Sequence, residues 1–297
     1  MSKLVIIDGN AIMHRSFHAI PRLTNRAGEP TNAAYGFVSM LLKTITDLKP
    51  THLVVCFDRK EKTFRHEDFE DYQSHRPETH EDLSSQFSKA TDICKSMKIP
   101  TFSKAGFEAD DLIGTISKEA KVDEVIIVTG DKDIFQLINK KVKVYVPIKG
   151  LSVAELMGEK EVFMKMGVTP KQIIDYKGLV GDSSDNYKGV PGVGPKTALT
   201  LLGDYKTFGG VYKNLDLIPE RIANLLKKGK KSGQMSFKLA KIIVDVDIEF
   251  DLEKAAAWQV HNKKVSDLFS ELSFRTLVKR AKNVGEQIEK EKQGELF

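Results

Sequence analysis

The sequence is poor in cysteine and has no long apolar run. Its two cysteines, Cys56 and Cys94, are too few for a disulfide framework and wrongly spaced for a zinc site. No apolar run is long enough to span a membrane, and the short apolar stretch before Asp8 favours a first β-strand over a signal peptide. These absences argue against a disulfide-rich secreted domain and against a membrane protein. We expect a cytoplasmic protein with reduced cysteines in its core.

The composition is that of a globular protein larger than one compact domain. Hydrophobic residues make up 41% of the 297 residues, which is enough to bury a sizeable core, and the length favours one large domain with a smaller one. The formal net charge of +5 suits a polyanionic partner, although charge alone does not establish one. The class of partner therefore has to come from the motifs.

Apolar runs alternate with helical periodicity over the first half of the chain. Strands are predicted at 3–8, 52–58, 124–129 and 142–146, and helices at 33–48, 83–97, 109–121 and 132–138. This alternation predicts an α/β fold with a mostly parallel, doubly wound sheet over residues 1–150. After residue 150 the pattern is wholly helical, so we expect a helical DNA-binding region at 151–285 and a charged tail at 286–297.

Nine acidic residues fall in five short clusters, four of which lie beside predicted strands. They are Asp8, Asp58, the group Glu108, Asp110 and Asp111, the pair Asp131 and Asp133, and the pair Asp182 and Asp185. A single aspartate in such a place is often only a turn former or a helix N-cap. Together, however, these carboxylates would repel one another unless divalent cations relieved the repulsion. In parallel sheets, ligands bind at the carboxyl ends of the strands, so the pattern predicts a magnesium-dependent site that cuts a phosphate backbone.

A densely charged segment at 59–82 follows the second predicted strand. A solvated loop is one interpretation of such a charge run. The alternative is an arch that clamps a single strand, because four basic residues alternate here with aromatic ones that could stack on bases. The basic residues are Lys60, Lys62, Arg65 and Arg76, and the aromatic ones are Phe64, Phe69 and Tyr72.

The segment GVPGVGPKTALTLL, within 185–203, places glycines in a tight turn before a helix. An ordinary corner between two helices would fit it. It also matches a helix-hairpin-helix, in which outward-facing backbone amides hold a DNA phosphate. The candidate DNA-binding residues are Gly192, Gly194, Lys196 and Thr197, and the backbone carbonyls of Val190 and Val193 are candidates for holding a potassium ion.

Five stretches carry a resemblance that covers nearly the whole chain. They are IDGNAIMHRSFHAI, FDRKEKTFRHEDFEDYQSHRP, GFEADDLIGT, VTGDKDIFQL and GLVGDSSDNYKGVPGVGPKTA. In this order they closely resemble the 5′-nuclease domain of bacterial DNA polymerase I, within the flap endonuclease family and its PIN-like core. The resemblance implies a monomeric, structure-specific nuclease that removes 5′ flaps and RNA primers and degrades duplex DNA from a 5′ end. The sequence leaves open a free-standing nuclease and an excised polymerase domain.

The same resemblance implies a role for each acidic residue. Two or three Mg²⁺ or Mn²⁺ ions would be held by carboxylates. Asp8, Asp58, Glu108 and Asp110 would surround the first ion, and Asp131, Asp133, Asp182 and Asp185 the second, with Asp111 supporting the cluster. Arg15, Lys60, Arg65, Tyr72, Gln73 and Arg76 would contact DNA.

Two positions depart from the family pattern. Gln73 stands where the family generally has a lysine that stabilises the scissile phosphate, and Tyr187-Lys188 replaces an apolar residue and proline. The first change keeps open a protein that binds flaps or junctions but cuts them weakly. A ribonuclease of the related small acidic-site fold is a third hypothesis, and the predicted hairpin and helical region argue against it.

The sequence ends in QGELF. Gln293, Leu296 and Phe297 match a short peptide by which bacterial enzymes dock on the sliding clamp, with the two apolar side chains in a pocket. A frayed terminus with two chance apolar residues is an equally simple interpretation.

Overall fold

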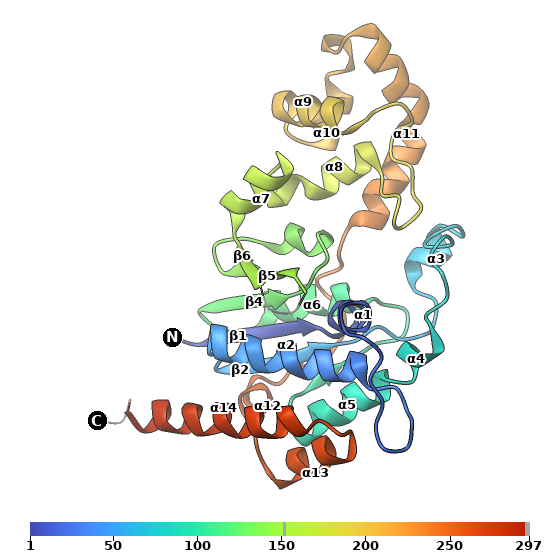
Figure 1. The fold of residues 1–297 in the computed structure, drawn as a ribbon. Coiled ribbons are helices and arrows are strands. Elements are labelled where there is room, and N and C mark those ends of the chain that lie inside the picture. Colours follow the sequence, from blue (N-terminus) through green and yellow to red (C-terminus); the bar gives the residue numbers. More distant parts are fainter. Residues whose placement is uncertain (151–152, 295–297) are drawn as a thin grey trace.

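A single six-stranded sheet forms the centre of the computed structural model, which describes residues 1–150 and 153–294 (Figure 1). The strands are β1 (Lys3–Asp8), β2 (His52–Cys56), β3 (Thr101–Phe102), β4 (Glu124–Val128), β5 (Val142–Lys149) and β6 (Val153–Met157). Their order is β3-β2-β1-β4-β5-β6, and all pairs are parallel except β5 with β6. The predicted α/β class with a mostly parallel sheet is confirmed. The prediction of wholly helical structure after residue 150 is wrong, because β6 pairs back on β5.

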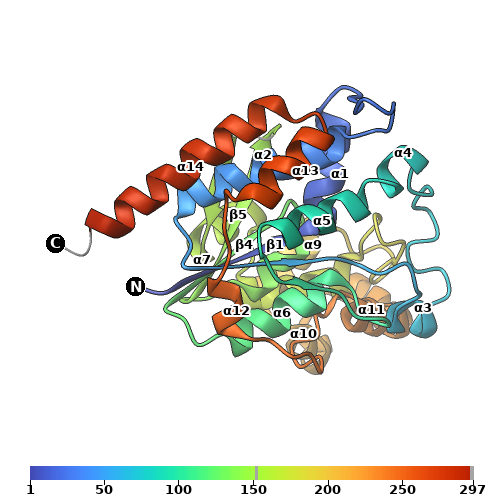
Figure 2. The ribbon, with the colours of Figure 1, turned by 90° about the horizontal axis from the view of Figure 1, so that it is seen from below.

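Side chains of β1 alternate between two buried clusters, as the two-residue period of a strand requires. Val5 and Ile7 face one cluster, and Leu4 and Ile6 face the other. The first face is covered by α1 (Gly9–Ala19), α2 (Asn32–Leu48), α5 (Phe87–Ser96), α13 (Lys263–Glu271) and α14 (Arg275–Gly294). The second is covered by α6 (Ala109–Glu119) and the 3₁₀ helix η1 (Asp133–Leu137) (Figure 2).

The second cluster continues into a helical region that stands away from α13 and α14 (Figure 1). Its elements are α7 (Glu159–Met166), η2 (Pro170–Gln172), α8 (Ile173–Val180), α9 (Pro195–Tyr205), α10 (Phe208–Lys213), η3 (Leu215–Leu217) and α11 (Glu220–Ala240). The chain then returns along α6, where Ile243 N–H donates to the Asp111 carboxylate at 2.8 Å and Val246 N–H donates to the Thr115 hydroxyl at 3.1 Å. Through α12 (Leu252–Ala256) it reaches the opposite face of the sheet.

The expected helical region at 151–285 does not coincide with one buried cluster, because its last helices pack with the first part of the chain. Phe269, Phe274 and Leu277 pack in the same cluster as the α2 side chains Phe37 and Leu41. The last helices therefore belong to the α/β core, because the apolar face of α2 needs a cover. Helix α14 continues through residues 286–294 of the expected charged tail. The clamp peptide lies outside the described residues, except for the backbone of its first two.

The helix predicted at 83–97 is interrupted. It is divided into α4 (Glu81–Ser84) and α5 at the buried residue Gln86, whose backbone N–H donates to the Leu83 carbonyl, three residues back, at 2.9 Å. Its amide oxygen accepts from Ala34 N–H in the first turn of α2 at 3.1 Å, and its amide nitrogen donates to the Asp82 carbonyl at 2.7 Å. Within the expected arch, α3 (Phe64–Asp68) is helical. In the part of the chain that the structure describes, no helix has the length and apolar character needed to cross a membrane.

Candidate active site

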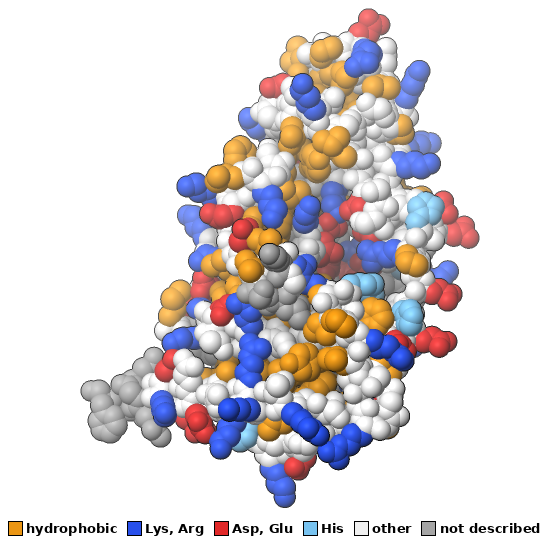
Figure 3. Space-filling model, in the orientation of Figure 1, with side chains coloured by type: hydrophobic (Ala, Val, Ile, Leu, Met, Phe, Trp, Pro, Cys, Tyr) orange, Lys and Arg blue, Asp and Glu red, His pale blue; other side chains and the backbone are white. Residues whose placement is uncertain are grey.

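Three of the predicted acids, Asp8, Asp58 and Asp131, lie at the carboxyl ends of the neighbouring parallel strands β1, β2 and β4. Asp8 closes β1 and caps α1, since its carboxylate accepts from Ala11 N–H at 2.9 Å and from the Thr129 hydroxyl at 2.6 Å. Asp58 follows β2 and accepts from Ala109 N–H at the start of α6 at 2.6 Å. These bonds connect β1, β2, β4 and α6 at one edge of the sheet. Figure 3 shows acidic side chains gathered in a hollow between the sheet and the helical region.

Of the four acids predicted for the first ion, only one has a protein cation to balance it in the described residues. In the described residues, Asp8, Asp58 and Asp110 form no ion pair, and only Glu108 lies near a guanidinium, that of Arg65 at 3.3 Å. Burial raises the pKa of Asp8 and the pKa of Glu108 to about 7 each. Burial, followed by the charges of Asp131 and Asp8, raises the pKa of Asp110 well above its ordinary value. A divalent cation would remove this repulsion.

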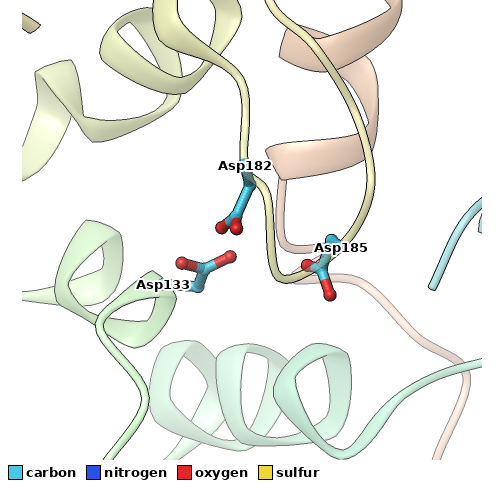
Figure 4. Close-up of side chains that lie close together, drawn as sticks. All are labelled: Asp133, Asp182 and Asp185. Atoms are coloured by element: carbon cyan, nitrogen blue, oxygen red, sulfur yellow. The ribbon is translucent and has the colours of Figure 1, made fainter. Parts of the chain in front are cut away.

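A second group is formed by Asp133, Asp182 and Asp185, whose carboxylate oxygens lie within 4.8 Å of one another (Figure 4). Asp133 begins η1, and the other two lie in the loop after α8. That loop is closed by two backbone bonds between Asp182 and Tyr187, of 2.8 and 3.0 Å. A short hairpin thus places two acids of the helical region opposite one acid of the sheet.

Lys177 lies among these carboxylates and was not predicted from the sequence. Its ammonium is buried, pairs with Asp133, and donates to Asp182 at 2.5 Å. Although burial raises the pKa of Asp182, the nearby Lys177 holds that pKa below its ordinary value. Arg76 from the arch pairs with Asp185 at 2.7 Å. Unlike the first group, the second is therefore compensated by protein cations.

The arch reaches the site through Tyr72 and Gln73. The Tyr72 ring is buried, and its hydroxyl lies 3.3 Å from Glu108 and 3.4 Å from Asp185. The Gln73 side-chain amide donates to the Asp185 carboxylate at 3.1 Å, and its backbone N–H donates to the Asp185 carbonyl at the same distance. Because its ring is covered, Tyr72 in this structure offers no face for stacking on a base, contrary to the sequence expectation.

Arg65 also differs from its expected role as a DNA contact. Its side chain is 3% exposed and binds both oxygens of Asp111 at 2.8 Å. It donates as well to the carbonyls of Leu239 and Lys241 at 3.0 Å each. Since every arm of the guanidinium has a protein partner, Arg65 and Asp111 connect the arch, α6 and the end of α11 instead of facing a ligand.

The other predicted DNA contacts lie at the surface. Arg15 donates to the Gly150 carbonyl at 2.8 Å, and Lys60, Gly192, Gly194 and Lys196 are exposed, with Thr197 partly so.

The hairpin before α9 depends on close backbone contact. A Cβ on Gly189, which has a φ of 62°, would lie 2.4 Å from the Gly181 nitrogen. Val190, a candidate for the potassium site, already accepts from Val193 N–H through its carbonyl at 2.9 Å.

The residues present fit hard divalent cations. Every candidate ligand is a carboxylate oxygen, the donor that Mg²⁺ and Mn²⁺ prefer. The first group has raised pKa values, and only its Glu108 pairs with a protein cation in the described residues; the second places three carboxylates within reach of one ion. Thr129 orients Asp8 from behind and also accepts from Asp131 N–H at 3.0 Å, so the supporting contacts are present too.

Both the sequence and the fold are similar to those of known proteins. The family described as 5′-3′ exonuclease, N-terminal resolvase-like domain, matches residues 3–167, and the 5′-3′ exonuclease, C-terminal SAM fold, matches residues 168–264. A 5′-3′ exonuclease of Bacillus subtilis is 37% identical over 86% of this chain and 88% of its own length.

DNA polymerase I of Bacillus caldotenax is 39% identical over 97% of this chain but only 33% of its own length, so the chain spans about a third of that polymerase. Among solved structures, the bacteriophage T5 flap endonuclease in a pseudo-enzyme-product complex with DNA and metal ions has a similar fold. The TM-score is 0.67 at 20% identity, covering 97% of this chain and 99% of that one.

Proposed function

Since the chain belongs to the 5′-3′ exonuclease family, we propose that it hydrolyses DNA phosphodiester bonds at 5′ ends and at the base of 5′ flaps, with Mg²⁺ or Mn²⁺. The observation that carries this proposal is the meeting of two carboxylate groups, one from the strand ends and one from the loop after α8. Removal of flaps and RNA primers during replication or repair is the corresponding role, with the protein acting as a monomer.

We assign the two carboxylate groups to two metal positions. Asp8, Asp58, Glu108 and Asp110 hold the first position, and Asp131, Asp133, Asp182 and Asp185 the second. When bound, the ions activate an attacking water and stabilise the leaving oxygen in an in-line displacement at phosphorus. The chain itself needs no covalent nucleophile. Its carboxylates hold the ions, and Thr129 keeps Asp8 in orientation.

DNA is held on both sides of this hollow. The exposed amides at Gly192 and Gly194, with Lys196 at the start of α9, suit a duplex backbone. On the other side, Lys60 and Arg76 of the arch suit the single-stranded 5′ end. The T5 relative was crystallised with DNA and metal ions, and this supports the same use of the same fold here. Docking on a sliding clamp through Gln293, Leu296 and Phe297 stays a separate prediction.

The test is single-turnover cleavage of a 5′-labelled DNA flap with magnesium and with a chelator. Asp131→Ala is expected to abolish cleavage while flap binding in chelator stays near that of the parent, because a ligand is lost but the DNA-binding surfaces are kept. Lys171→Ala, an exposed change in η2, serves as the control and should cleave normally. Equal cleavage by Asp131→Ala and parent would contradict the two-metal assignment.

A flap-binding protein that cuts weakly is the second candidate. It is favoured by Gln73, an uncharged side chain that donates to Asp185 where the family generally has a lysine. It is opposed by the complete acidic set and by the Arg76 guanidinium 2.7 Å from the same carboxylate. Tight flap binding without magnesium- or manganese-dependent cuts would select this candidate. Failure to cut a DNA-only flap while cutting RNA would select the ribonuclease.

A further inference from the structure

No motif of the sequence predicts that Lys177 lies among the acidic residues of the site. It lies on α8, five residues before Asp182, and its side chain is only 9% exposed. The ammonium contacts carboxylates on both sides, Asp133 from the sheet and Asp182 from the hairpin. A buried ammonium is costly unless it is paired, so these two contacts determine where the side chain rests.

The two carboxylate groups differ in this respect. Asp8, Asp58 and Asp110 form no ion pair in the described residues, whereas Asp133 and Asp182 share Lys177 and Asp185 holds Arg76. The carboxylate oxygens that would bind an ion in the second position therefore already pair with Lys177 or Arg76. For an ion to contact both Asp133 and Asp182, the Lys177 ammonium has to move off them.

An acceptor for the displaced ammonium is present at the same place. The hydroxyl of Tyr187 is buried and has no hydrogen-bond partner in the described structure, and the whole side chain is 3% exposed. Such an unpaired buried hydroxyl is uncommon, since it loses its bonds to water and gains none in the protein. Tyr187 closes the hairpin through its two backbone bonds with Asp182, and its ring packs with Tyr72, Leu239 and Ala240. Tyr187 thus belongs to the same hairpin as Asp182, one of the two carboxylates that Lys177 binds.

We propose that Lys177 is a displaceable internal cation: it fills the second metal position by bridging Asp133 and Asp182, and an arriving divalent ion moves it onto the hydroxyl of Tyr187. This inference rests on the proposed two-metal function. It makes Lys177 and Tyr187 positioning residues that set the affinity of the second ion without touching substrate. Among the described residues only Glu108 of the first position pairs with a protein cation, so the first position fills before the second.

The first experiment measures binding of Mn²⁺ alone, without DNA, by calorimetry and by electron paramagnetic resonance. In the parent we expect a tighter and a weaker site. Lys177→Met should tighten the weaker site on the order of tenfold, the factor for a competitor that fills the site nine-tenths of the time. The tighter site should change little. Asp182→Asn serves as the control that identifies the weaker site by removing it.

A second variant separates displacement from a plain charge effect. Tyr187→Phe keeps the ring but removes the resting place of the displaced ammonium, so the weaker site should lose affinity by about threefold. In the Lys177→Met background, Tyr187→Phe should leave the Mn²⁺ affinity of the weaker site unchanged, because no ammonium remains to bind the Tyr187 hydroxyl. A general effect of charge would instead leave Tyr187→Phe equal to the parent.

Folding is checked by melting in a chelator. In the chelator, Lys177→Met is expected to have a lower melting temperature than the parent, since two carboxylates lose their cation. Added Mn²⁺ should raise the melting temperature of this variant more than that of the parent. Equal Mn²⁺ affinity of the weaker site in Lys177→Met and parent, or an undiminished Tyr187→Phe effect in the double variant, would overturn the inference. Absence of any second Mn²⁺ site in the folded parent would overturn the two-metal proposal as well.

Discussion

At the scale of residues, Asp185 has the most varied surroundings in the site. It lies 2.7 Å from Arg76, 3.1 Å from the Gln73 amide and 3.4 Å from the Tyr72 hydroxyl, all from the arch. The arch is thus connected to the candidate metal ligands by three different donors. A substitution in the arch can change the charge near the ligands without changing any ligand.

Gln73→Lys is expected to raise the single-turnover rate of flap cleavage about tenfold or more. A charged donor near developing negative charge is worth on the order of 10² in rate in comparable sites, and Arg76 already supplies part of it here. The measurement is quenched-flow cleavage with magnesium. Gln73→Met, of similar length and without charge, is the control, and its single-turnover cleavage rate should not rise. An unchanged rate for Gln73→Lys would mean that Arg76 suffices.

Seven of the nine acidic residues could be singled out from the sequence because each follows a predicted strand or begins a predicted helix, whereas Asp182 and Asp185 stood out only beside the predicted hairpin. Lys177 and Tyr187 could not be singled out. A single lysine in the apolar segment IIDYKGLV carries no motif, and its burial follows only from the contact between α8 and η1. For the same reason Arg65 was interpreted as a surface cation, whereas the fold surrounds it with Asp111 and two carbonyls.

At the scale of elements, the alternation of apolar runs is sufficient to predict β1, β2, β4 and β5. It failed for β6, which has exposed apolar side chains at Val153 and Leu156 and looks like neither a buried strand nor an amphipathic helix. It also failed at Gln86, where a buried amide that binds the first turn of α2 interrupts the expected helix. Tertiary partners overrode local pattern in the second case.

Arg65→Met tests whether the contact between α3, α6 and the end of α11 is structural. Removing one partner of a buried ion pair leaves the other uncompensated, so the free energy of unfolding should fall by about 3–5 kcal/mol. Urea unfolding of the metal-free protein measures this. Lys62→Met, an exposed change just before the same helix, should stay within about 0.5 kcal/mol. If Arg65→Met weakened DNA binding alone, the contact with DNA inferred from the sequence would be right.

At the scale of the whole molecule, buried carboxylates that repel one another gather in the hollow between the sheet and the helical region. Asp8 and Glu108, each with a pKa of about 7 in the fold, have ordinary values of 3.8 and 4.5. Between about pH 4 and pH 7 the folded chain therefore holds protons that the unfolded chain releases, and its free energy of unfolding falls as the pH rises.

In a chelator, the melting temperature is accordingly expected to fall from pH 5.5 to pH 8, and magnesium should restore it most at pH 8, where the carboxylates are ionised. Scanning calorimetry at several pH values measures both curves. Asp110→Asn, which resembles the protonated acid, should melt above the parent at pH 8 in chelator. A melting temperature that rises with pH in the chelator would contradict this account.

The packing of α14 and α13 on α2 has a consequence for biosynthesis. Phe269, Phe274 and Leu277 are made after every strand of the sheet, yet they cover the apolar face of a helix made near the beginning. On the ribosome, the part of the buried cluster around α2 that α13 and α14 cover stays exposed until residue 277 has emerged. We therefore expect the packing on this face of the sheet to be completed late, after the strands and α2 have been made.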